Sequence, residues 1–240
     1  MMQLLPYLIL GLSIFIFYLI VRSVRRQQVE QKAIFQELGF SEIATPDPRL
    51  VEKVIRLRQT GQAKARVSSV YMRRHGHFTL YLMKIRTGSD SDSSRQWTTA
   101  IVSDELKLPS FALGPSIPLK GKFGALLNKA IAWALERRGF SQVPMHPDSA
   151  FSKRYLLYTK ESGASMDNVP ESAWQRLAQF KERLMIEASD DLLLFWVMQI
   201  DGEPAGRRTL SLTRDGLRNQ IDCAQKLFEL FRETAVIAAR

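Results

Sequence analysis

Histidines and paired carboxylates are the residues of this chain whose types and spacing could build a metal or acid–base site. His75 and His77 stand two residues apart, which would place both on one face of a β-strand. A zinc site needs a third ligand, and a turn that contains histidine is commonly polar surface, so we expect no metal there. Asp190 and Asp191 are adjacent, and adjacent strand residues point to opposite faces. They are therefore not expected to form a catalytic carboxylate pair.

Motifs for the common nucleotide-binding and hydrolytic sites do not occur in the sequence. Gly121 and Lys122 come closest to a P-loop, but Ser116 stands where its first glycine belongs and Phe123 replaces the serine or threonine. One cysteine, Cys223, excludes a disulfide framework and a multi-cysteine zinc site, and it is expected to be a small core residue. We predict no catalytic residue, no cofactor and no metal, with an enzyme of unrecognised type as an alternative.

Positive charge is the main compositional feature. The chain carries 34 Lys and Arg against 24 Asp and Glu, a net charge of +10 and a pI of about 9.9. Such a surface attracts anionic lipid. Nucleic acid is not expected as a partner, because aromatic residues are not interleaved with Lys and Arg on one face. Six cations are candidate contacts with an anionic surface: Arg22, Arg25, Arg26, Arg49, Lys53 and Arg56.

Leu4 to Val21 form an apolar run of 18 residues without a charge. A helix of that length covers about 27 Å, close to the thickness of a bilayer's hydrocarbon core. A cleaved signal peptide would need a basic start and a small-residue cleavage site, which are missing. The arginines that follow, from Arg22 to Arg26, place the C-terminal part in the cytoplasm and the N-terminus outside. The run predicts a single-pass membrane anchor.

Hydrophobic periodicity predicts an α+β fold behind this anchor. Helices are predicted over residues 22–38, 48–60, 121–138, 169–184 and 213–238. Strands are predicted over residues 64–74, 78–86, 97–102, 152–159, 191–200 and 209–212. Residues 106–118 carry three prolines and a glycine and are expected to be extended but irregular. No internal repeat is evident.

Aromatic and apolar residues suggest where the core lies. The four tryptophans are well spread and are expected in the core: Trp97, Trp133, Trp174 and Trp196. The last helix has a heptad-like apolar stripe from Leu217 to Ala235. This stripe either docks on the protein's own sheet or binds a protein partner or a second copy of the chain.

Two short motifs carry a family resemblance. Leu108 to Pro115 reads L-P-x-F-x-L-x-P, and Phe151 to Tyr158 reads F-S-K-R-Y-L-L-Y ahead of a helix. Together with the N-terminal span, they resemble uncharacterised bacterial single-pass membrane proteins. The resemblance implies a bacterial inner membrane and provides no catalytic residues.

We therefore predict an α+β protein with an N-terminal transmembrane helix followed by a mixed or antiparallel sheet domain with packed helices. The expected division is an anchor over 1–21, a juxtamembrane helix and linker over 22–47, and two α+β lobes over 48–140 and 141–240. The expected function is a non-enzymatic interaction or scaffold module at the cytoplasmic face of the membrane. The alternatives are a binder of anionic lipid or nucleic acid through the basic surface, and an unrecognised enzyme.

Overall fold

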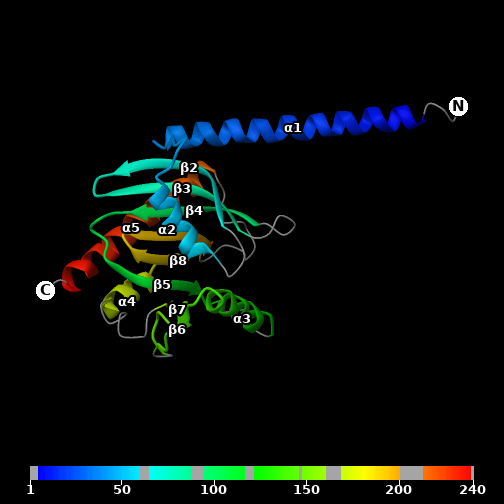
Figure 1. Ribbon diagram of the computed structural model, residues 1–240. Coiled ribbons are helices and arrows are strands. Elements are labelled where there is room, and N and C mark those ends of the chain that lie inside the picture. The colour runs from blue at the N-terminus through cyan, green and yellow to red at the C-terminus, as the bar shows by residue number, and fades with distance from the viewer. Residues whose placement is uncertain are drawn as a thin grey trace.

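A long helix projects from a body in which one β-sheet carries helices on both faces (Figure 1). The computed structural model describes residues 5–59, 65–87, 94–116, 122–145, 148–160, 169–200 and 213–238. Every neighbouring pair of strands in the sheet is antiparallel. The α+β class and the antiparallel form of the sheet are thus confirmed.

The described part of the chain contains five helices and nine strands. The helices are α1 (Leu5–Glu37), α2 (Pro48–Arg58), α3 (Lys122–Glu136), α4 (Glu171–Ala178) and α5 (Arg214–Ala238). The strands are β1 (Ser41–Glu42), β2 (Arg66–His75), β3 (Phe78–Thr87), β4 (Ser94–Val102), β5 (Leu108–Pro115), β6 (Ser141–Gln142), β7 (Tyr155–Thr159), β8 (Glu182–Asp190) and β9 (Leu192–Ile200). Their order in the sheet is β1-β2-β3-β4-β9-β8-β5-β7-β6.

Strong local signals explain the elements that the sequence predicted well. Asp47 caps α2 because its Oδ1 accepts a hydrogen bond from the Arg49 amide at 2.9 Å, and Pro48 fits the first helical turn. Leu50 and Val54 then repeat at helical spacing and are buried. The predicted hairpin is confirmed, with Gly76 at a φ of +54° in the turn between β2 and β3.

Helices cover the two faces of the sheet differently. One face carries α2 and α3, which pack on side chains that include Leu194 and Trp196 of β9. The other face carries α4, α5 and the end of α1, which pack with Leu193 and Phe195. Residues of β9 alternate between the faces because successive strand side chains point in opposite directions. This strand therefore lies in the core between both helical layers.

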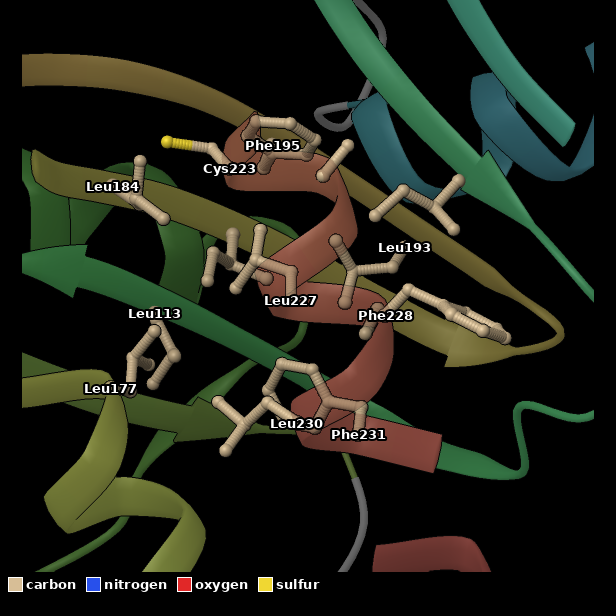
Figure 2. Packing of buried hydrophobic residues seen from close by; sticks show 14 of the residues in the cluster. Leu113, Leu177, Leu184, Leu193, Phe195, Cys223, Leu227, Phe228, Leu230 and Phe231 are labelled. Atoms are coloured by element: carbon tan, nitrogen blue, oxygen red, sulfur yellow. The ribbon is translucent and has the colours of Figure 1, made fainter. Parts of the chain in front are cut away.

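The apolar stripe of α5 packs on the chain's own sheet (Figure 2). Leu227 and Phe231 are fully buried, and Phe228 contacts the ring of Phe78 with centroids 4.7 Å apart. The docking alternative of the sequence analysis is therefore the one that the structure adopts. Cys223 lies in the same layer and is completely buried, as expected.

Two segments differ from their predictions. Residues 108–115 form a regular strand, β5, between β8 and β7. Its register with β8 shifts between Leu108 and Phe111, so the missing amide of Pro109 falls where the ladder is interrupted. The predicted helix over 169–184 ends at Ala178, and β8 begins at Glu182. The predicted strand over 209–212 lies outside the described residues.

The same unit occurs twice, although the sequence analysis found no repeat. Both α1 and α3 end at a Gly-Phe-Ser segment in which the glycine has a positive φ, +79° at Gly39 and +80° at Gly139. The amide of the following phenylalanine donates to the carbonyl five residues earlier, at 2.8 and 3.1 Å. Phe40 and Phe140 are buried, and β1 and β6 then form the opposite edges of the sheet. A motif of this length is too short to reveal a repeat by sequence alone.

The side chains of residues 1–14 lie outside the described part of the chain. Farther along α1, Phe15, Phe17 and Tyr18 are exposed, and the helix ends with Phe35 in the core. As far as the helices are described, none combines the length and the apolar character needed to cross a membrane.

Candidate functional site

A cleft of about 270 Å³ opens beside α2, where β5, β7 and β8 meet at one end of the sheet. Five of its eight lining residues carry a cationic group or a hydroxyl group. The residues that line it are Lys53, Arg56, Leu57, Ser110, Lys160, Ser189, Asp190 and Leu192. Because these residues come from one helix and several strands, only the tertiary fold brings them together.

Lysine and aspartate side chains hold α2 to the turn between β8 and β9. The Lys53 ammonium group lies 2.5 Å from Asp191 Oδ1 and 3.7 Å from Asp190 Oδ2. Asp190 has a φ of +56°, a left-handed conformation that aspartate tolerates better than most residues. The two carboxylates therefore fix the position of a cation at the cleft wall, which is a structural use of this pair.

A hydroxyl pair from two neighbouring strands also lines the cleft. Ser110 Oγ and Ser189 Oγ lie 2.9 Å apart across the β5–β8 pairing. The backbone amide of Lys160 donates to the Ser110 carbonyl at 3.1 Å, which sets the start of the Lys160 side chain beside this pair. The ammonium group of Lys160 also lies 4.8 Å from the centroid of the Phe140 ring.

A buried carboxylate with two arginines lies under the same face of the sheet. Glu187 of β8 has no exposed side-chain surface, and Arg138 is exposed by only 7%. Arg58 Nη1 donates to Glu187 Oε1 at 3.0 Å, and Arg138 donates to both oxygens at 2.8 and 2.6 Å. Arg138 also donates to the Leu57 carbonyl. This ion cluster joins the end of α2 to the turn after α3.

Burial and neighbouring charges shift the pKa values of two groups in this region. Burial by itself raises the pKa of Glu187, but the two arginines outweigh it and lower the pKa below the ordinary value. Desolvation lowers the pKa of Lys160, and the positive charge of Arg138 lowers it further. The cluster therefore holds Glu187 ionised, while Lys160 sits in a positive environment.

The structure brings together two of the six predicted anionic-surface contacts. Lys53 and Arg56 both line the cleft, and Arg56 Nη2 also donates a hydrogen bond to Glu52 Oε1 at 2.8 Å on the exposed side of α2. Arg49 is exposed at the start of α2. The remaining three lie exposed along α1 and do not line the cleft: Arg22, Arg25 and Arg26.

His75 and His77, for which no shared metal was expected, have separate partners. The His75 ring stacks on Phe78 with centroids 4.9 Å apart, while His77 Nδ1 lies 2.7 Å from Glu105 Oε1. In the described ranges, no group of three or more histidine, cysteine or acidic side chains could hold a metal ion. Burial raises the pKa of Cys223 to about 12, so its thiol is protonated at neutral pH.

Sequence reasoning missed Lys160, both serines and the Glu187 cluster. Arg58 follows the candidate contacts Lys53 and Arg56 along α2, but it turns inward, and its guanidinium lies 4.5 Å from the centroid of the Trp196 ring. Glu187 offered no signal, because the helix predicted for the preceding residues hid the alternation of β8. Trp133 is a further correction: it is 58% exposed because α3 packs through Ile131 and Leu135 instead.

Comparison with known proteins gives no relative for this arrangement: no protein-family model, curated protein sequence or solved structure matches the chain.

Proposed function

We propose that this protein is a membrane-anchored, non-enzymatic interaction module whose folded domain lies at the cytoplasmic face of a bacterial inner membrane. The contrast between the two ends of α1 is the observation that carries the proposal. Near its C-terminal end, Phe35 is buried and its ring lies 4.5 Å from that of Tyr71. Farther towards the N-terminus, Phe15 and Phe17 are 57% and 68% exposed. Large apolar side chains on such a helix favour transfer out of water.

The sequence also supports a lipid environment for the N-terminal part of α1. The run from Leu4 to Val21 has no charge, and Arg22, Arg25 and Arg26 follow it at once. A basic flank of this kind stays on the cytoplasmic side during insertion and attracts anionic headgroups. Because Phe35 fixes the end of α1 in the core, the domain would follow the anchor directly, without a loose linker.

An interaction role agrees with the chemistry of the buried charges. Glu187 accepts hydrogen bonds from two arginines, and its lowered pKa keeps it ionised near neutral pH. It therefore cannot serve as a general acid there. The charged side chains that line the cleft, such as Lys53 and Lys160, are instead suited to binding a charged partner.

Alkaline extraction of membranes from cells that make the full chain tests the anchor. We expect the wild-type chain to stay with the membranes, and a variant with Leu12→Arg and Phe15→Arg to be released. Two arginines near the centre of the span cost about 5–7 kcal/mol of insertion free energy. The matched control carries Val29→Arg and Ala33→Arg, outside the apolar run, and should stay with the membranes. Release of the wild-type chain would refute the anchor.

Protease added to intact spheroplasts tests the orientation. The domain should be protected until the membrane is permeabilised, because the positive flank of the span stays inside. Digestion of the domain in intact spheroplasts would show the opposite topology, whatever the result of the extraction.

A further inference from the structure

We propose that the cleft beside α2 binds the phosphate group of a small soluble molecule, either inorganic phosphate or a phosphate monoester. This inference goes beyond membrane attachment, and only the choice of a soluble ligand over a lipid rests on the proposed function. Ammonium and guanidinium groups together with hydroxyl donors are the side chains that bind phosphate oxygens most strongly. The cleft gathers all three kinds of donor.

Formal charge in the lining favours an anion. Lys53, Arg56 and Lys160 contribute three positive charges. Asp190 and Asp191, both within 4 Å of the Lys53 ammonium group, contribute two negative charges, which leaves one positive charge in excess. Glu52 pairs with Arg56, but both side chains are at least 70% exposed, and an ion pair so exposed is weak. The Arg56 guanidinium can therefore turn to a ligand at little cost.

The serine pair can supply a neutral donor. Ser110 and Ser189 share one hydrogen bond of 2.9 Å, in which one hydroxyl donates and the other accepts. The accepting hydroxyl keeps its own hydrogen, which can be donated to a phosphate oxygen. The hydroxyl pair thus adds a neutral donor to the three cations that line the same cleft.

The surroundings of Lys160 favour a bound anion, because they disfavour its charged form in the free cleft. Its pKa is lowered by desolvation first and by the charges of Arg138 and Arg56 in addition, while Glu187 acts in the opposite direction. A dianionic phosphate beside Lys160 would offset this repulsion. A bound anion would thus favour the charged form of Lys160.

Strand register places the cleft away from the membrane side of the domain. Ser110 pairs near Ser189, at the sheet end where Val102 faces Leu192. The N-terminal part of α1 extends past the opposite end, where Thr87 faces Ser94 (Figure 1). A lipid headgroup in the bilayer around α1 would not reach the cleft, so a soluble phosphate is the expected ligand.

The cleft volume limits the size of the ligand. At about 270 Å³, it falls just below the range of about 300–1,000 Å³ that is usual for drug-sized ligands. It suits a phosphate group with a small substituent. A nucleic-acid strand is not required to explain the basic lining.

Calorimetric titration of the full chain with inorganic phosphate, in micelles of an uncharged detergent at constant ionic strength, tests the site. We expect saturable binding with a Kd below about 1 mM. Lys160→Gln and Lys53→Gln should each weaken binding about tenfold or more, because each removes a charge-assisted contact. Lys181→Gln, an exposed lysine outside the cleft, should leave the Kd within about twofold. No saturable binding, or equal Kd values in all variants, would overturn the proposal.

Lysine acetylation by an anhydride, followed by peptide mass spectrometry, gives a second readout that does not require a variant to fold. Phosphate should slow the modification of Lys160 and leave that of Lys181 unchanged; equal rates with and without phosphate would overturn the proposal.

The source of the ligand is tested in nanodiscs. Added phosphatidic acid should not compete with inorganic phosphate, and competition would assign the cleft to a lipid headgroup. The micelle titration stays informative even if the anchor test fails.

Discussion

Glu187 illustrates how a single buried charge can join two parts of a fold. Its carboxylate receives hydrogen bonds from Arg58 at the end of α2 and from Arg138 after α3. Glu187→Gln keeps the shape but leaves two arginines without a counter-charge in the interior. We expect the free energy of unfolding to fall by about 3–5 kcal/mol at pH 7, measured by chemical denaturation of the full chain in micelles. Glu52→Gln, which breaks an exposed pair, should cost less than about 1 kcal/mol.

The pH dependence follows from the direction of the Glu187 pKa. Because folding lowers this pKa, the carboxylate contributes stability that is fully present above its unfolded value of 4.5 and is lost as pH falls through the folded value. The wild-type chain should therefore lose its advantage over Glu187→Gln as the pH falls below about 4.5. A difference between the two chains that stays constant from pH 7 to strongly acidic pH would contradict this account.

At the scale of elements, the close approach of α3 to the backbone of β5 limits which residue can stand at position 114. A Cβ on Gly114 of β5 would lie 3.0 Å from Ile131 Cγ2 of α3 and 3.7 Å from Met185 Sδ. Gly114→Ala should therefore lower the free energy of unfolding by about 1–3 kcal/mol through overpacking. In an Ile131→Ala background the same change should cost much less, because the contact is removed. Equal costs in both backgrounds, by thermal or chemical denaturation, would show that the glycine serves another purpose.

Elements with local signals were predictable, and elements decided by pairing were not. Asp47 and Pro48 mark the start of α2, and the helical spacing of Lys53 and Arg56 brings both to the cleft. By contrast, β5 and β8 owe their strand form to neighbours on both sides, which no local pattern reports. The cleft residue Lys160 belongs to a different segment from α2, so its place depends on strand register. For the same reason, the buried partner of Arg58 could not be inferred.

At the scale of the whole molecule, α3 presents an exposed apolar face at the end of the sheet from which α1 projects. Leu126, Ala130 and Trp133 follow one face of α3 at helical spacing and are exposed, the first and last by 64% and 58%. The guanidinium of Arg137 lies 4.4 Å from the centroid of the Trp133 ring. This helix follows the end of β5 that lies towards the projecting part of α1 (Figure 1). Apolar and cationic residues so arranged are typical of a membrane interface.

We predict that the exposed face of α3 with Trp133 lies next to a bilayer around the N-terminal part of α1, because an indole ring favours the headgroup region. In the full chain reconstituted into phosphatidylcholine vesicles, brominated lipids should quench part of the tryptophan fluorescence. Trp133→Phe should remove most of the quenched part, whereas Trp97→Phe should retain it, because Trp97 packs against Phe35 with ring centroids 5.5 Å apart. Equal quenching in the wild-type chain and in Trp133→Phe would show that α3 does not touch the bilayer. The anchor would then hold the domain at a distance from the lipid surface, with α1 as the only contact.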